Sequence, residues 1–90
     1  MLKINYHMSF KKDYKKARKR GLDMSAIHNV INMLANEVPL PVQYKDHALK
    51  GEYIGYRECH VQNDWLLIYK IEEDILTLTL AYMGTHSDLF

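Results

Sequence analysis

Cysteine is nearly absent from this chain of 90 residues, in which Cys59 stands alone. One cysteine excludes an intramolecular disulfide, and with it a disulfide-stapled secreted scaffold. Long apolar runs are missing too. No segment approaches the roughly 20 apolar residues that cross a bilayer, and the first residues hold no run that fits a signal peptide. We therefore expect a cytoplasmic protein with no membrane partner.

Closely spaced metal ligands are also missing. The histidines at 47, 60 and 86 form no pair of the H-x₃-H kind. Cys59 precedes His60 in a predicted strand, so the two side chains point to opposite faces. Zinc is therefore disfavoured, and we expect neither a metal nor another cofactor. Repeats and low-complexity segments are absent, and this length fits a single domain over residues 1–90.

Acidic residues are few at the start of the chain, and basic residues are missing from its end. The net charge is only +1, but residues 1–25 hold eight Lys or Arg against Asp13 and Asp23. Residues 71–90 hold four acidic residues and no Lys or Arg. The basic segment predicts an acidic partner, which could be a phosphate backbone or an acidic protein.

A strand and two helices are predicted in the first half. Leu2, Ile4, Tyr6 and Met8 alternate with polar residues, which predicts a first strand with one buried face. With Ser9 as N-cap, residues 10–20 predict a basic helix that ends at a glycine.

A second helix begins after Asp23 or Ser25 as cap and runs to about Asn36 with an apolar face. Pro39 and Pro41 then favour an extended loop.

Three strands follow, at residues 56–61, 65–71 and 75–83, separated by short polar turns. The middle one is apolar at nearly every position, which indicates a central strand. In the last, Leu76, Leu78 and Leu80 share one face, and Gly84 ends the strand. The order β-α-α-β-β-β predicts an α+β fold: a small antiparallel sheet with the first strand at an edge and both N-terminal helices packed on one face.

Four titratable residues lie at the edges of these segments: His47, His60, Asp64 and His86. If the strands are neighbours, these groups surround one patch, and Glu58 shares the face of His60. Such a set suits RNA cleavage by attack of the 2′-hydroxyl on the adjacent phosphate, which needs a base and an acid but no metal.

Three further features each have a structural and a functional interpretation. Trp65 is either a core residue or a stacking surface for a base. Phe90 is either a loose end or a cap on the site. The basic helix is either a solvated face or an anion-binding surface, and seven cations in one helix favour the latter.

The chain resembles the YafQ branch of the RelE/ParE toxin superfamily. The resemblance covers nearly the whole chain, and the motifs that carry it are Tyr44-Lys45-Asp46-His47, Leu49-x-Gly51, Tyr56-Arg57-Glu58-Cys59-His60-Val61, Asp64-Trp65-Leu66-Leu67-Ile68-Tyr69 and Gly84-Thr85-His86-Ser87-x-Leu89-Phe90. It implies a RelE-like, microbial-ribonuclease-like fold and a bacterial type II toxin. Such a toxin is a metal-independent endoribonuclease that cuts mRNA in the ribosomal A site.

The resemblance also implies partners and roles. The partners would be the ribosome, mRNA and a DinJ- or RelB-like antitoxin, through which the complex binds operator DNA. His47, His60, Asp64 and His86 match catalytic positions, with His86 preferred as general acid. Glu58, Trp65 and Phe90 match supporting positions. The expected contacts to ribosomal RNA are Lys11, Lys12, Lys15, Lys16, Lys19 and Arg20.

One position departs from the family pattern. Related sequences usually carry arginine two residues before the glycine of this Gly-Thr-His motif, where this chain has Tyr82. An arginine there would stabilise the phosphorane with a permanent charge. Lys45, Lys50 or Arg57 would have to supply that charge, although strand parity places Arg57 opposite His60.

Two alternatives to a ribosome-dependent endoribonuclease stay open at this point. One is a toxin-like module with little or no catalysis that binds RNA or antitoxin, which the missing arginine favours. The other is a ParE-type gyrase inhibitor, whose branch shares the fold but generally lacks this histidine set.

Overall fold

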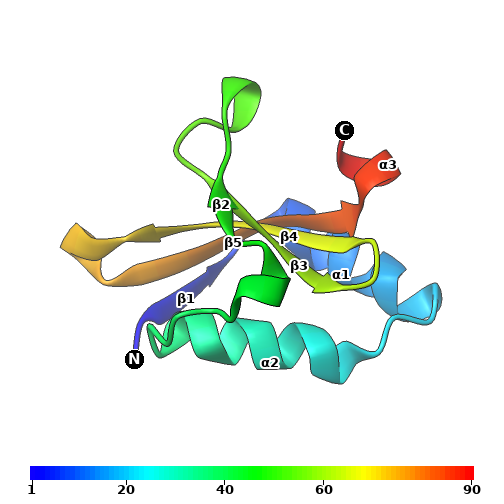
Figure 1. Cartoon of the computed structure of the whole chain (residues 1–90), viewed down its shortest axis with the longest axis horizontal. Helices are drawn as coiled ribbons and strands as arrows, with labels where there is room; N and C mark the ends of the chain where they lie inside the picture. Colours follow the sequence, from blue (N-terminus) through cyan, green and yellow to red (C-terminus); the bar gives the residue numbers. More distant parts are fainter.

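A five-stranded sheet with two long helices on one face forms the protein (Figure 1). The structure is a computed structural model that describes residues 1–90. The helices are α1 Met8–Lys19, α2 Met24–Ala35 and the short α3 His86–Leu89. The strands are β1 Lys3–Tyr6, β2 His47–Ala48, β3 Arg57–Gln62, β4 Trp65–Glu72 and β5 Thr77–Thr85.

The strand order is β1-β5-β4-β3-β2, so β4 is central and β1 lies at an edge, as predicted. All pairings are antiparallel except that between β1 and β5, which is parallel. The α+β class is therefore confirmed. The predicted sheet lacked β2, because two residues are too short for an alternation pattern to be visible. No helix is both long and apolar enough to span a bilayer.

The core lies between the helices and one face of the sheet. Its apolar residues come from α1, α2, β3, β4 and β5 and form one buried cluster. Ala17, Ile27 and Leu67, one from each of three elements, are fully buried within it. The opposite face has no long helix, and in Figure 1 only the loop after β2 and the C-terminal α3 rise from it.

A β-bulge in β5 decides which residues reach that opposite face. Tyr69 pairs with Leu80 while Ile68 pairs with Tyr82, so Ala81 is the extra residue. Leu78 and Leu80 point into the core before the bulge, and Met83 does so after it. Simple alternation would have sent Tyr82 into the core with the leucines, but the bulge turns it to the open face instead.

The first strand and helix differ from the prediction in two respects. Tyr6 and Met8 are 48% and 69% exposed, so the predicted buried face of the first strand ends at Ile4. The first helix starts at Met8 with His7 as N-cap, and Ser9 is not the cap. Its hydroxyl instead donates a hydrogen bond of 2.6 Å to the carbonyl oxygen of Ala81 at the bulge. The predicted cap of the second helix, Asp23, is confirmed by its bond from the Ser25 amide.

The last strand also starts later and ends later than predicted. Ile75 closes a 3₁₀ turn and Leu76 has a left-handed backbone with φ of 49°, which takes both out of the strand. Leu76 is 62% exposed and does not join Leu78 and Leu80 on the core face. Gly84 does not end the strand, which continues to Thr85.

Arg57 lies on the core side of β3, where it forms a salt bridge with Asp46. Its guanidinium pairs with the Asp46 carboxylate at 3.1 Å, and the Tyr69 hydroxyl donates to the same carboxylate. Of the three cations named for the charge on the phosphorane, Arg57 therefore lies on the sheet face opposite His60, as strand parity indicated. The cluster instead fixes the segment just before His47 to the sheet.

We expect stability to fall in alkaline solution because of Cys59 on β3. Burial raises the pKa of its thiol to about 12. The unfolded chain releases this proton near pH 9.0, so the thiol's contribution is complete below that pH and is lost as pH rises toward 12. The loss is at most about 1.4 kcal/mol per pH unit. Burial and the hydrogen bond to Asp46 also raise the pKa of Tyr69, so this phenol adds to the loss of stability in alkaline solution.

Urea unfolding at a series of pH values measures this slope. Cys59→Ala should flatten it between pH 9.0 and 12, the window set by the unfolded and folded thiol. The raised pKa values of Tyr69 and Tyr53, both due first to burial, contribute to the slope that remains. Equal slopes in wild type and variant would show that the thiol is not buried in solution.

Candidate active site

The open face of the sheet carries the polar residues in two cross-strand rows. One row runs from His47 to Glu58, Ile68 and Tyr82. The next begins at His60 and runs through Leu66 to Gly84, two residues before His86. Neighbouring residues in a row are about 5 Å apart. The sheet therefore places His47, Glu58, His60 and Tyr82 on one surface, at whose border α3 begins.

His47 and Glu58 form the most closely defined pair of this surface. The Nε2 atom of His47 lies 3.5 Å from Oε1 of Glu58, whose side chain is only 6% exposed. The Nδ1 atom lies 2.7 Å from the carbonyl oxygen of Lys45. A carbonyl only accepts, so Nδ1 carries a proton and donates it to this bond, while Nε2 faces the Glu58 carboxylate. The other oxygen of Glu58 is buried without a partner.

His60 lines a groove together with Lys45. The groove has a volume of about 340 Å³ and lies between β3 and the segment before β2. Lys45 adopts a left-handed backbone, with φ of 50°, at the end of the short 3₁₀ helix Val42–Tyr44. Of the three cations expected to serve the site, Lys45 is thus the one that the structure brings to a histidine. Lys50 is exposed in the loop after β2, where no salt bridge holds it.

His86 opens the helix α3, so its backbone is held in a regular element. Its ring lies against that of Phe90, with centroids 5.2 Å apart. Phe90 in turn contacts Tyr53 from the loop after β2, and Tyr53 contacts Tyr82, each with centroids 5.7 Å apart. An aromatic wall of Tyr53, Tyr82 and Phe90 therefore borders the site. Phe90 is 56% exposed, so one part of this wall is open to a ligand.

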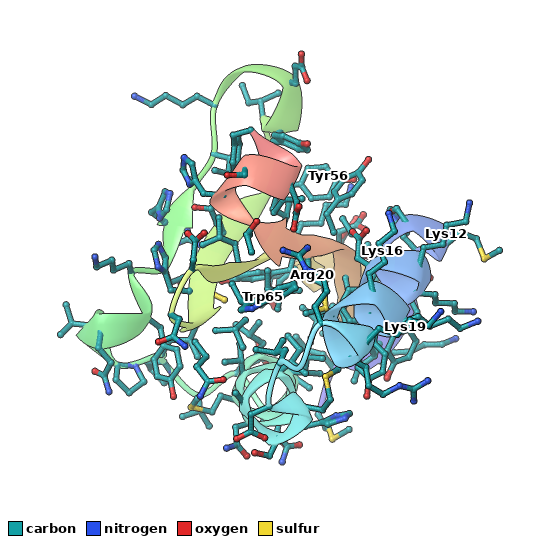
Figure 2. The ribbon with its side chains drawn as sticks, turned by 90° about the vertical axis from the view of Figure 1, so that its right-hand side faces the viewer. Lys12, Lys16, Lys19, Arg20, Tyr56 and Trp65 are labelled. Carbon is teal, nitrogen blue, oxygen red and sulfur yellow. The ribbon has the colours of Figure 1, made fainter.

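Asp64 and Trp65 lie at the end of the sheet rather than among the histidines. Asp64 is exposed in the β3–β4 turn, next to the row that pairs Trp65 with Thr85, the N-cap of α3. No hydrogen bond or ion pair joins it to His60. Trp65 points to the helix side and packs against the core. There, the guanidinium carbon of Arg20 lies 4.7 Å from the centre of its ring (Figure 2).

The cations of α1 divide between two surfaces. Lys12, Lys16 and Lys19 lie on the side of α1 that Figure 2 turns to the viewer, and Lys16 is the one that borders the end of β5 and α3. Lys11, Lys15 and Arg18 line a separate groove of about 410 Å³ between α1 and α2. None of these six forms a salt bridge. Arg20 differs, because it pairs with Asp88 at 2.7 Å.

Sequence reasoning missed Tyr53 and Asp88, and it gave Arg20 only a role in RNA binding. Tyr53 was overlooked because no local pattern links a loop residue to the C-terminus. Arg20 and Asp88, 68 positions apart, form a contact that only the fold reveals. The capping-box spacing of Thr85 and Asp88 is visible in the sequence and could have predicted α3. No group of three His, Cys, Asp or Glu residues is arranged to hold a metal ion.

These features define a small α+β protein with histidines and a buried carboxylate on an open sheet face, beside a basic helix. Comparison with known proteins makes the class specific. The family model described as "Bacterial toxin of type II toxin-antitoxin system, YafQ" matches residues 2–90. The chain therefore belongs to the YafQ family, and it is the toxin component of a type II toxin–antitoxin system.

Relatives match over nearly their whole length. The mRNA interferase toxin YafQ of Escherichia coli K12 is 43% identical over 88 residues, which are 97% of this chain and 94% of that protein. A metal-bound toxin from Helicobacter pylori superposes with a TM-score of 0.92 at 44% identity, with both chains fully covered. YafQ in the DinJ–YafQ complex of E. coli gives 0.90 at 42% identity, covering 100% of this chain and 99% of that one.

Proposed function

We propose that this chain is an endoribonuclease that cuts mRNA on the ribosome by attack of the 2′-hydroxyl on the adjacent phosphate. The observation that carries the proposal is the open sheet face, where two cross-strand rows gather His47, Glu58 and His60 and lead to His86. Relatives named mRNA interferase support RNA as substrate. They speak against a gyrase inhibitor, which was the second of the two alternatives.

The roles of these groups follow from their neighbours. Nδ1 of His47 donates to the carbonyl oxygen of Lys45 and Nε2 lies beside Glu58, so we assign His47 to stabilising negative charge on the phosphate. His60 has no such fixed partner and stands beside Lys45 in an open groove, which suits it to accept the 2′-hydroxyl proton. His86, exposed on α3, would protonate the leaving 5′-oxygen. Asp64 lies near α3 and would orient His86 or take the place of the base.

The other assignments rest on position. Lys45 would stabilise the phosphorane together with His47, and Lys50 would bind flanking phosphate. The row Lys12, Lys16 and Lys19 lies on the same side as α3 and would contact ribosomal RNA through its phosphates. In the cytoplasm, a DinJ-like antitoxin would hold the toxin inactive, and the complex would bind operator DNA through the antitoxin. The groove with Lys11, Lys15 and Arg18 would bind either ribosomal RNA or an acidic segment of the antitoxin.

Expression of the chain alone tests the proposal. We expect growth arrest together with new mRNA 5′ ends that keep a fixed register to the reading frame. Added ribosomes should be required for cleavage of purified mRNA in vitro. Arrest with intact mRNA would contradict nuclease action. It would instead favour a module that only binds RNA or antitoxin, the alternative that Tyr82 in place of arginine supports.

A further inference from the structure

We propose that Arg20 is a positioning residue, which ties the basic helix α1 to α3 and thereby holds His86 in place. The inference rests on the proposed function, since it assigns His86 a part in cleavage. The contacts themselves involve none of the histidines. They lie at the C-terminal end of β5, where Arg20 and Trp65 from the helix side meet α3.

The first contact is the close packing of α3 on the end of β5. A Cβ atom added to Gly84 would lie 2.9 Å from Cβ of Asp88 and 3.4 Å from Cγ of Leu89. Real Cβ atoms essentially never approach so closely, so α3 folds back against a strand that must carry glycine here. The position of His86 therefore depends on how firmly this short helix stays seated.

The second contact is the cap of α3. The Asp88 carboxylate accepts a hydrogen bond of 2.9 Å from the amide of Thr85, while the Thr85 side chain completes a capping box. The hydrogen bond from the Thr85 amide lowers the pKa of Asp88, and the hydrogen bond from Arg20 lowers it further. A helix of four residues has almost no stability of its own, so the partner that orients this carboxylate matters.

That partner is Arg20, the C-cap residue of α1. One guanidinium nitrogen lies 2.7 Å from Oδ2 of Asp88. The flat face of the same guanidinium rests on Trp65, 4.7 Å from the ring centre. Figure 2 shows Arg20 reaching from the end of α1 across Trp65 toward the base of α3. Arginine is suited to this place because its planar group stacks and pairs at once, which lysine does only in part.

The same side of α1 is fastened to β5 at two earlier points. Ser9 donates to the carbonyl oxygen of Ala81, and Asp13 accepts a 3.0 Å bond from the amide of Met83. These bonds engage the bulge residue Ala81 itself and the strand just after it. Burial raises the pKa of Asp13, as expected for a carboxylate held against the sheet. Arg20 thus completes a line of polar contacts between α1 and the strand that leads to His86.

The exposure of the pair limits the size of the effect. The Arg20 and Asp88 side chains are 47% and 39% exposed, and an isolated ion pair of that kind adds little to global stability. The consequence should instead be local. We expect loss of either partner to lower the maximal cleavage rate about fivefold, as α3 spends less time seated, with little change in the unfolding midpoint.

The test is a double-mutant cycle with Arg20→Gln and Asp88→Asn on the full chain. Each single variant should lose about fivefold in single-turnover rate at saturating toxin, and the double variant should lose no more than either. Arg20→Lys should recover part of the rate. Lys3→Gln is the matched control, because it removes an exposed cation that forms no salt bridge and lies beside Thr77, at the opposite end of β5 from α3. Its maximal rate should equal that of the wild type.

Amide hydrogen exchange of residues 85–90 in the free toxin gives a second readout that needs no ribosome. Exchange there should accelerate in Arg20→Gln and Asp88→Asn, but not in Lys3→Gln. Additive losses in the cycle, or unchanged exchange in Arg20→Gln, would overturn the proposal. If the wild type cleaves no RNA, the proposed function fails, while the exchange data still decide whether Arg20 holds α3.

Discussion

Substitution of His86 by alanine is expected to lower mRNA cleavage by about 10²- to 10⁴-fold, the usual contribution of one general acid. His86 is exposed at the first position of α3 and contacts only the ring of Phe90 among the aromatic residues. Its loss therefore removes the proton donor without opening the core. The rate is measured as single-turnover cleavage of a ribosome-bound message, and folding is checked by the urea midpoint.

Ser87→Ala is the matched control for this change. Ser87 is exposed in the same short helix and its hydroxyl makes no hydrogen bond, so the variant should cleave like the wild type. Antitoxin binding should persist in both variants. A His86→Ala protein that cleaves at the wild-type rate would remove His86 from the mechanism and leave the acid among His47, His60 and Asp64.

The strand rows show how much of the site can be predicted from sequence. Alternation placed Glu58 and His60 on one face, and short polar turns made three consecutive strands neighbours. Those two rules depend only on local chemistry, so they hold before any tertiary contact is known. They also correctly excluded Arg57 from the histidine face, where the structure shows it bound to Asp46 instead.

The bulge at Ala81 shows why the same rules failed elsewhere. One extra residue reverses the parity of everything after it, so Tyr82 faces the site and Met83 faces the core. Nothing in the local sequence marks this position. The bulge is instead supported from α1, through Ser9 and Asp13, which lie 72 and 70 positions earlier. Long-range support of this kind explains why Ser9 was mistaken for a helix cap.

The aromatic wall has a similar origin. Tyr53 meets Tyr82 and Phe90 only because the loop after β2 and the helix α3 rise from the same face of the sheet (Figure 1). The sequence revealed that Tyr82 occupies the usual place of arginine, but not what the tyrosine touches. The structure gives the substitution a partner: a phenol that packs against a second phenol, on the same row as Glu58 and His47.

Tyr82→Arg should therefore raise the cleavage rate, by about ten- to a hundredfold if the guanidinium reaches the phosphorane. Position 82 lies on the open face, where an arginine adds a permanent charge that neither a neutral phenol nor the present histidines supply. The same variant should make cleavage more sensitive to salt, since it adds a phosphate contact. Single-turnover rates at two salt concentrations measure both effects.

Tyr82→Phe separates the hydroxyl from the ring in this experiment. It keeps the edge contact with Tyr53 and through it the support of Phe90, so we expect a rate within about twofold of wild type. This expectation follows because a partly exposed hydroxyl without a hydrogen-bond partner adds little. If Tyr82→Arg loses activity while Tyr82→Phe retains it, the ring contact matters more than added charge. Position 82 would then serve the aromatic wall, and the charge on the phosphorane would have to come from His47 and Lys45.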